Sequence, residues 1–217
     1  MRLLRLIFVI GVVTELLAVA PARAAEKPPQ LSPELTALLA REKAYRKACK
    51  IEICAILASK SAEGDDIACH VIKTWLKSDI EKIIARSHVG WPWGHARCQT
   101  DLSLPRATLV AAMREKKYVA KLASHRVTCV LDREKKGDKF EFEVNASARI
   151  TFENAKAMAS SIKWGKVEAP TVVKGVLWSA TGLDNKLNIF GSELTRIVNE
   201  FVGVKCAEVK DDVARLQ

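Results

Sequence analysis

Two short motifs carry the residue types that bind zinc. His95 lies three residues before Cys98, and His125 lies four residues before Cys129. Two imidazoles and two thiolates complete a tetrahedral zinc site when the fold brings them together. The ligand spacing of zinc fingers is absent, however, and facing cysteines in an oxidising compartment form a disulfide instead. We therefore expect a Cys98–Cys129 disulfide and no metal site.

The remaining cysteines also favour disulfides. The chain has six cysteines, and an even number in an exported protein is typical of a covalent framework. The sequence does not select one pairing among the many that are possible. The elements inferred below favour Cys49–Cys206 and Cys54–Cys69, the second joining two consecutive helices. The disulfide candidates are Cys49, Cys54, Cys69, Cys98, Cys129 and Cys206.

No motif for catalysis or for a cofactor is present in the sequence. The nucleophile elbow, the phosphate-binding loop, the metalloprotease helix and the dinucleotide-binding glycine pattern are all missing. Cys69-His70 ends like a haem attachment motif, but Asp66 stands where the first cysteine would be. We interpret single carboxylates such as Asp101 and Asp184 as turn or surface groups. The sequence therefore predicts no catalytic residue, no metal ligand and no cofactor.

The segment 89–94 holds two tryptophans on a loop, because its two glycines and one proline exclude regular structure. Such rings can form a platform for a sugar ring or for a partner's apolar patch. Alternatively, both rings cover the end of the core, where a large ring buries roughly 150–250 Å². If the platform exists, two polar neighbours would take part in it. The weak candidates for partner binding are Trp91, Trp93, His95 and Arg97.

The first 24 residues have the organisation of a secretory signal peptide. Two arginines precede an apolar run that ends at Ala20, and Ala22-Arg23-Ala24 places small residues at the cleavage positions. Glu15 interrupts the run, which argues against a retained membrane anchor. We expect cleavage before Ala25, a location in the periplasm or outside the cell, and no transmembrane span after processing.

The composition is that of a basic globular chain. Of its 217 residues, 49% are hydrophobic, and the net charge is +10. The chain can therefore bury a sizeable core and attract anionic partners. Its basic and acidic residues are interspersed, which is typical of a solvated surface rather than a polyanion-binding tract. We expect the partner to be an unknown protein, a glycan or an anionic envelope component, and not nucleic acid.

The clearest element is a strand from Lys139 to Phe152. Apolar residues occupy every second position in it, so one face is apolar and the other is hydrated. The segments His125–Arg133 and Lys156–Trp164 also alternate, the first joined to the strand by a polar turn at 134–138. The pattern predicts an antiparallel meander of these three strands, and Ala96–Leu104 is a candidate for a further strand.

Helices are predicted before and after this meander. Ser32-Pro33 is typical of a helix start. The segment 67–84 is predicted to be the clearest helix, because its apolar residues recur about every four positions. A capping box beginning at Ser78 allows this helix to stop and restart there. Further helices are predicted at 106–117 and after Pro170.

The predicted fold class is α+β, an antiparallel β-meander of three to five strands packed with N-terminal and C-terminal amphipathic helices. The expected organisation is a signal peptide at 1–24, a flexible lead-in at 25–31 and a single domain at 32–217. Within that domain, we expect a helical part at 32–87 and a mixed part of sheet and helices at 95–209.

The predicted function is that of an exported, non-catalytic binding or envelope-associated protein stabilised by disulfides. One alternative is a carrier of an apolar ligand in a cavity between sheet and helices. Another is a small envelope hydrolase with an unrecognised site. An apolar pocket of several hundred Å³ favours the carrier, whereas a tryptophan loop exposed over a filled core favours the binding protein.

Overall fold

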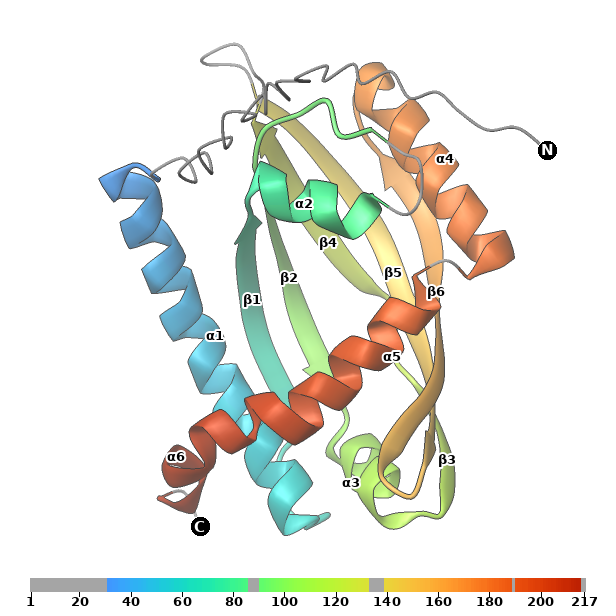
Figure 1. Ribbon diagram of the computed structural model, residues 1–217. Coiled ribbons are helices and arrows are strands. Elements are labelled where there is room, and N and C mark those ends of the chain that lie inside the picture. Colours follow the sequence, from blue (N-terminus) through green and yellow to red (C-terminus); the bar gives the residue numbers. More distant parts are fainter. Residues whose placement is uncertain (1–30, 86–89, 133–138, 189, 216–217) are drawn as a thin grey trace, which may run out of the picture. The chain divides into compact units, whose positions relative to one another are not determined.

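A sheet of six antiparallel strands runs through the structure, a computed structural model that describes residues 31–85, 90–132, 139–188 and 190–215 (Figure 1). The residues from Pro33 onward group into one compact unit. In chain order, the described elements are α1 (Pro33–Ser59), β1 (Ile67–Trp75), α2 (Lys77–Ile84), β2 (Ala96–Leu104), α3 (Arg106–Arg114), β3 (Lys117–Lys121), β4 (His125–Asp132), β5 (Lys139–Glu153), β6 (Lys156–Glu168), α4 (Thr171–Leu187), α5 (Gly191–Glu200), the π-helical turn η1 (Phe201–Lys205), the 3-10 turn η2 (Ala207–Val209) and α6 (Lys210–Ala214).

The sheet is centred on β5. One edge of β5 pairs with β4 from Lys139 to Ala146 and with β3 from Arg149 to Glu153, while β6 pairs along the opposite edge. Strands β2 and β1 continue the sheet beyond β4. The predicted meander is therefore present as β4, β5 and β6, and the α+β class with N-terminal and C-terminal helices is confirmed. The turn predicted at 134–138 lies outside the described residues.

Residues 67–75 form a strand, so the helix predicted at 67–84 is wrong over its first half. Strand β1 pairs with β2 along its whole length. Residues four apart share one side of a helix but also one face of a strand, so their recurrence did not distinguish the two structures. Helix α2 then begins at Lys77. With β1 and β3 added, the sheet has six strands rather than three to five.

The apolar face of the sheet carries the core. Leu131 and Phe142 belong to a cluster that α2 and α4 cover through Ile80 and Val173. A separate cluster around Ile150, at the other end of β5, is covered by α3 and α5. Figure 1 shows α5 crossing the sheet and α4 lying beside the upper part of β6. The helices thus cover the face that the alternation in β5 predicts to be buried.

Helix α1 covers the outer edge of β1 (Figure 1). An uncovered edge strand presents N–H and C=O groups that can pair with another chain. The carboxylate of Glu42 accepts hydrogen bonds from the backbone N–H of Thr74 at 2.7 Å and from its hydroxyl at 3.0 Å. Arg46 donates to the carbonyl of Ile72. Side chains of α1 therefore satisfy two backbone groups on the edge of β1, the N–H of Thr74 and the carbonyl of Ile72.

Glu42 is buried, with an exposed fraction of 2%. Arg97 on β2 donates to its carboxylate at 2.9 Å. Burial by itself raises the pKa of this carboxyl, but the hydrogen bonds from Arg97 and Thr74 together outweigh burial and hold the pKa below its usual value. Because the pKa is lower in the folded state, ionised Glu42 stabilises the fold above the titration range of a free glutamate.

We expect Glu42→Gln to lower the free energy of unfolding by about 2 kcal/mol at neutral pH, because a charged acceptor is lost and an amide group then faces the donors. This contribution is complete above the titration range of a free glutamate and is lost as the pH falls through the lowered pKa of Glu42 in the folded state. Urea titrations at neutral pH and at about pH 3 measure the difference. Glu52→Gln, at an exposed position of α1, is the control. Equal losses in the two variants would contradict the assignment.

Candidate ligand cavity

An apolar cavity of about 490 Å³ lies between the inner face of the sheet and helices α2, α4 and α5. Inward-facing residues of β2, β4, β5 and β6 form its floor. The described residues that line it are Trp75, Ile80, Ile84, Trp91, Ala96, Cys98, Leu122, His125, Val127, Cys129, Phe142, Val144, Ala146, Ser147, Ala148, Ile162, Trp164, Val167, Leu177, Thr181, Phe190 and Leu194.

Two small residues in the middle of β5 help to create this space. Ala146 and Ala148 are consecutive inward-facing residues, and both line the cavity. Larger side chains stand at either end of the same row, with Phe142 on one side and Phe152 on the other. The helices pack against these larger residues, so space remains over the alanines. The two alanines are visible in the sequence, but the packing of the helices decides whether the space above them stays empty.

Three of the described lining residues are polar, namely His125, Ser147 and Thr181. His125 and Thr181 are within hydrogen-bond distance of backbone atoms. The hydroxyl of Thr181 donates to the carbonyl of Leu177 at 2.8 Å. The Nε2 atom of His125 lies 3.0 Å from the backbone nitrogen of Ser103 and 3.1 Å from its oxygen. A cavity with this lining binds a ligand mainly through burial of apolar surface.

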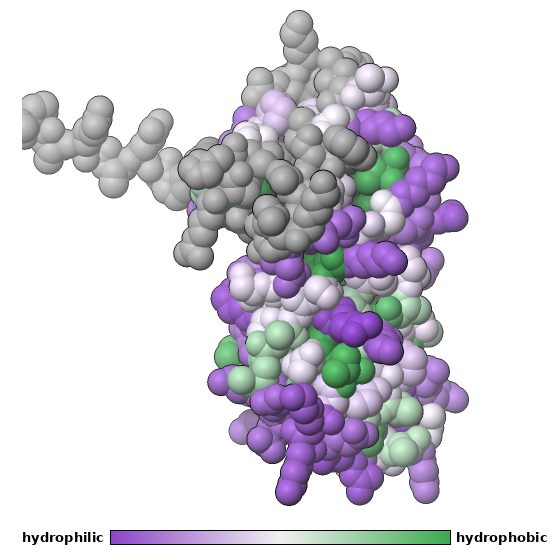
Figure 2. Space-filling model, turned by 90° about the vertical axis from the view of Figure 1, so that its right-hand side faces the viewer, coloured by the Kyte–Doolittle hydropathy of each residue, from purple (hydrophilic) through white to green (hydrophobic). Residues whose placement is uncertain are grey.

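The apolar lining is turned inward. Figure 2 views the structure from the side of β6 and α4. Hydrophilic residues cover most of the coloured surface in this view, and hydrophobic residues form small separate patches between them. The coloured surface on this side is therefore mostly hydrophilic, whereas the apolar residues that line the cavity lie on the inner face of the sheet and on the helices over it.

The four residues predicted to bind a partner have separate roles in the structure. Trp93 is buried, with an exposed fraction of 4%, and Trp91 meets it edge-on at a centroid distance of 4.8 Å. Trp91 donates its indole N–H to a carbonyl of its own loop and lines the cavity. His95 accepts a hydrogen bond from the backbone at the start of α2, and Arg97 holds the buried carboxylate of α1. The tryptophans thus cover part of the core.

Cys98 and Cys129 form the predicted disulfide, which joins β2 to β4 and lines the cavity. Both thiol sulfurs of the alternative zinc site are thereby used. Its two histidines, His95 and His125, each contact backbone atoms instead. Among the described residues, no group of three or more His, Cys, Asp or Glu side chains is placed to hold a metal ion.

The other two disulfides are Cys49–Cys69 and Cys54–Cys206, so the predicted Cys49–Cys206 and Cys54–Cys69 pairs are wrong. The reason is β1. The predicted Cys54–Cys69 pair requires Cys69 to lie on a helix next to α1, but Cys69 lies on the inner face of a strand. Cys49 and Cys54 are five residues apart on α1, which separates them by about 140° around the helix axis. Cys49 therefore faces the sheet, and Cys54 faces the C-terminal segment, residues 201–214, which comprises η1, η2 and α6.

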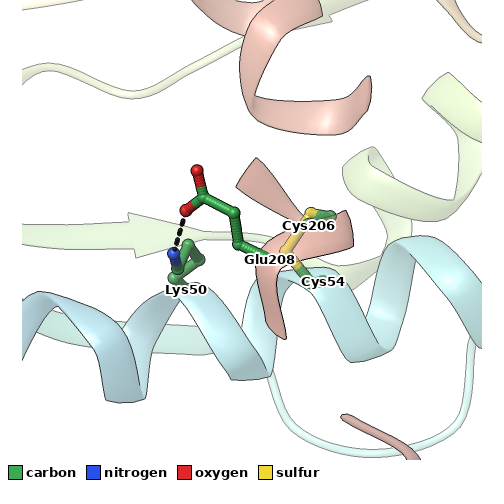
Figure 3. Close-up of a disulfide and its surroundings, with 4 residues drawn as sticks. All are labelled: Lys50, Cys54, Cys206 and Glu208. Carbon is green, nitrogen blue, oxygen red and sulfur yellow. Dashed lines mark hydrogen bonds and ion pairs between the residues drawn. A yellow bond between two sulfur atoms is a disulfide. The ribbon is translucent and has the colours of Figure 1, made fainter. Parts of the chain in front are cut away.

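The C-terminal segment is fixed to α1 by this last disulfide and by ion pairs. Figure 3 shows the Cys54–Cys206 bond with Lys50 and Glu208 beside it, whose charged atoms are 3.1 Å apart. Lys47 and Asp212 form a second ion pair at 2.8 Å. These contacts hold the end of the chain against a helix near its beginning.

Asp184 has a structural role that its sequence context did not indicate. The sequence indicates a turn or surface group at this position, but the exposed fraction of Asp184 is 1%. Its carboxylate accepts hydrogen bonds from the indole N–H of Trp164 at 2.6 Å and from the backbone N–H of Phe190 at 2.7 Å. Both partners line the cavity, so Asp184 orients two parts of the cavity wall. Asp101, by contrast, is exposed and pairs with His70.

Comparison with known proteins does not identify a family. No family model, curated protein or solved structure matches the chain. Of the helices that the structure describes, none is long and apolar enough to span a bilayer. The function must therefore be argued from the cavity and the residues around it.

Proposed function

We propose that this protein is an exported carrier that binds a small apolar molecule in the cavity between its sheet and helices. The observation that supports this function is the cavity itself, about 490 Å³ in volume with an almost entirely apolar lining. Small-molecule sites measure roughly 300–1,000 Å³ and are lined mainly by hydrophobic and aromatic side chains. A ligand that fills the cavity gives its walls new dispersion contacts, so it stabilises the folded state.

The three disulfides support the exported part of the proposal. Disulfides persist in oxidising compartments outside the cytoplasm and are rare in the reducing cytosol. The signal peptide expected at 1–24 lies outside the described residues, and its cleavage belongs to the proposal. The buried position of Trp93 favours the carrier over a binding protein that uses an exposed tryptophan platform.

Fluorescence titration with N-phenylnaphthylamine tests the carrier function. This neutral dye brightens in apolar surroundings, and we expect saturable binding of one dye per chain. Because a ligand stabilises only the state that binds it, dye at 100 times its dissociation constant should add about 2.7 kcal/mol to the free energy of unfolding. The absence of saturable binding would contradict the proposal.

Ala148→Phe is expected to weaken dye binding by about tenfold or more, because the added ring occupies space that the dye needs. Ala159→Phe is the matched control, since Ala159 is exposed on β6 and lies opposite Thr151 on the outer face. The control should bind the dye as the unmutated protein does. Thermal melts check that both variants are folded. Equal affinities in the two variants would place the dye site outside the cavity.

A further inference from the structure

Three cations lie together on the outer face of the sheet, one on each of three strands. They are Lys121 of β3, Arg149 of β5 and Lys163 of β6, and all three are exposed. Lys121 stands directly opposite Arg149 in the ladder, and Lys163 stands opposite Ser147, which is two residues from Arg149 on the same face. Like charges directly opposite each other destabilise a sheet. We refer to these three residues as the cation cluster.

Neighbouring cations on this face have acidic partners. Lys117 pairs with Glu153 at 3.2 Å, and Arg126 pairs with Glu143 at 3.1 Å. These two ion pairs lie on either side of the cation cluster along β5. Within the described part of the chain, no ion pair joins the cation cluster to an acidic side chain. Its positive charge is therefore available to an anion from outside the protein.

The cation cluster lines a hollow of about 270 Å³ that adjoins the apolar cavity. Ser147 and Ser161 also line the hollow and add hydroxyl groups to it. Leu122, Ser147 and Ala148 line both the hollow and the cavity. Here the β3–β5 ladder ends at Lys121–Arg149 and the β4–β5 ladder ends at His125–Ala146, and residues 122–124 connect β3 to β4. Within this interruption the backbone N–H of Leu122 still donates to the carbonyl of Ala148 at 2.8 Å. The apolar cavity and the cationic hollow thus meet across an interruption in the sheet.

We propose that the carried ligand is a fatty acid whose hydrocarbon chain occupies the cavity and whose carboxylate lies against the cation cluster. This assignment rests on the proposed carrier function, because the chain requires the cavity. A carboxylate at the cluster places negative charge between cations that otherwise repel one another. The guanidinium of Arg149 offers a planar set of donors that suits a carboxylate.

Displacement of N-phenylnaphthylamine by laurate, with lauryl alcohol as the uncharged molecule of the same chain length, tests the assignment on the full chain. We expect laurate to bind about tenfold more tightly than the alcohol. This advantage should shrink at high salt, because the cluster is exposed and salt screens exposed charges. Caprate, which is two methylenes shorter, should bind about fifteenfold more weakly than laurate, since each buried methylene contributes about fourfold.

The variant Arg149→Gln with Lys163→Gln removes two cations of the cluster. Lys117→Gln with Arg126→Gln removes two ion-paired cations of the same face and is the matched control. The cluster variant should lose the preference for laurate over lauryl alcohol and keep its affinity for the dye and the alcohol, whereas the control should keep the preference.

Two results would overturn the fatty-acid assignment and leave the carrier function standing. One is equal binding of laurate and lauryl alcohol by the unmutated protein. The other is an unchanged preference for laurate in the cluster variant. If neither the dye nor the alcohol binds at all, the carrier function is overturned, and the fatty-acid assignment falls with it.

Discussion

Replacing Cys54 and Cys206 with alanine is expected to lower the free energy of unfolding by about 5 kcal/mol. The bond between them joins residues 152 positions apart, and a longer closed loop restricts the unfolded chain more strongly. Alanine is preferable to serine, because Cys54 has an exposed fraction of 2% and a buried hydroxyl would add a cost of its own. Loss of the bond also removes the covalent attachment of the C-terminal segment to α1.

Denaturant unfolding followed by circular dichroism measures this effect. The matched variant replaces Cys49 and Cys69, whose separation is 20 residues, and we expect a loss of about 3 kcal/mol for it. The order of the two losses is the test. A greater loss for the shorter loop would contradict the chain-entropy explanation, and no loss for Cys54 and Cys206 would mean that noncovalent contacts alone fix the C-terminal segment.

Phe142→Asp is the second change with a large expected effect, a loss of about 4 kcal/mol or more in the free energy of unfolding. Phe142 has an exposed fraction of 9% and lies in the core cluster that contains Leu131. Truncating a buried aromatic ring costs about 3–5 kcal/mol, and the new carboxylate faces an apolar lining without a partner. Because Phe142 also lines the cavity, the variant should bind N-phenylnaphthylamine more weakly.

Glu141→Lys is the control for this substitution. Glu141 is the neighbouring residue on β5, is exposed and points to the outer face, so the change should cost less than about 0.5 kcal/mol. Thermal melts of both variants provide the comparison. Similar shifts in melting temperature would show that β5 does not separate a buried face from a hydrated one.

The sequence by itself determined the elements whose pattern has a single structural interpretation. Fourteen consecutive positions of alternation, from Lys139 to Phe152, fit only a strand with one buried face, and β5 runs from Lys139 to Glu153. Local helix starts were equally informative, because proline fits the first turn of a helix. Helix α1 begins at Pro33, and α4 begins directly after Pro170.

Only the tertiary structure decided the conformation of residues 67–75 and the disulfide pairing that depends on it. Ile67, Val71 and Trp75 would share one side of a helix, and they equally share one face of a strand. The choice between the two was made by pairing with β2, an interaction with residues distant in the sequence. That pairing placed Cys69 opposite α1, which left Cys54 to bond with Cys206.

The cavity and its cationic hollow were also decided by the tertiary structure. The sequence contains Ala146 and Ala148 on the inward face of β5, but it does not indicate whether a helix fills the space above them. Helices α2, α4 and α5 pack on the larger residues toward the two ends of β5, and this placement depends on contacts between distant segments. Likewise, Lys121, Arg149 and Lys163 meet only because the register of β3, β5 and β6 aligns them.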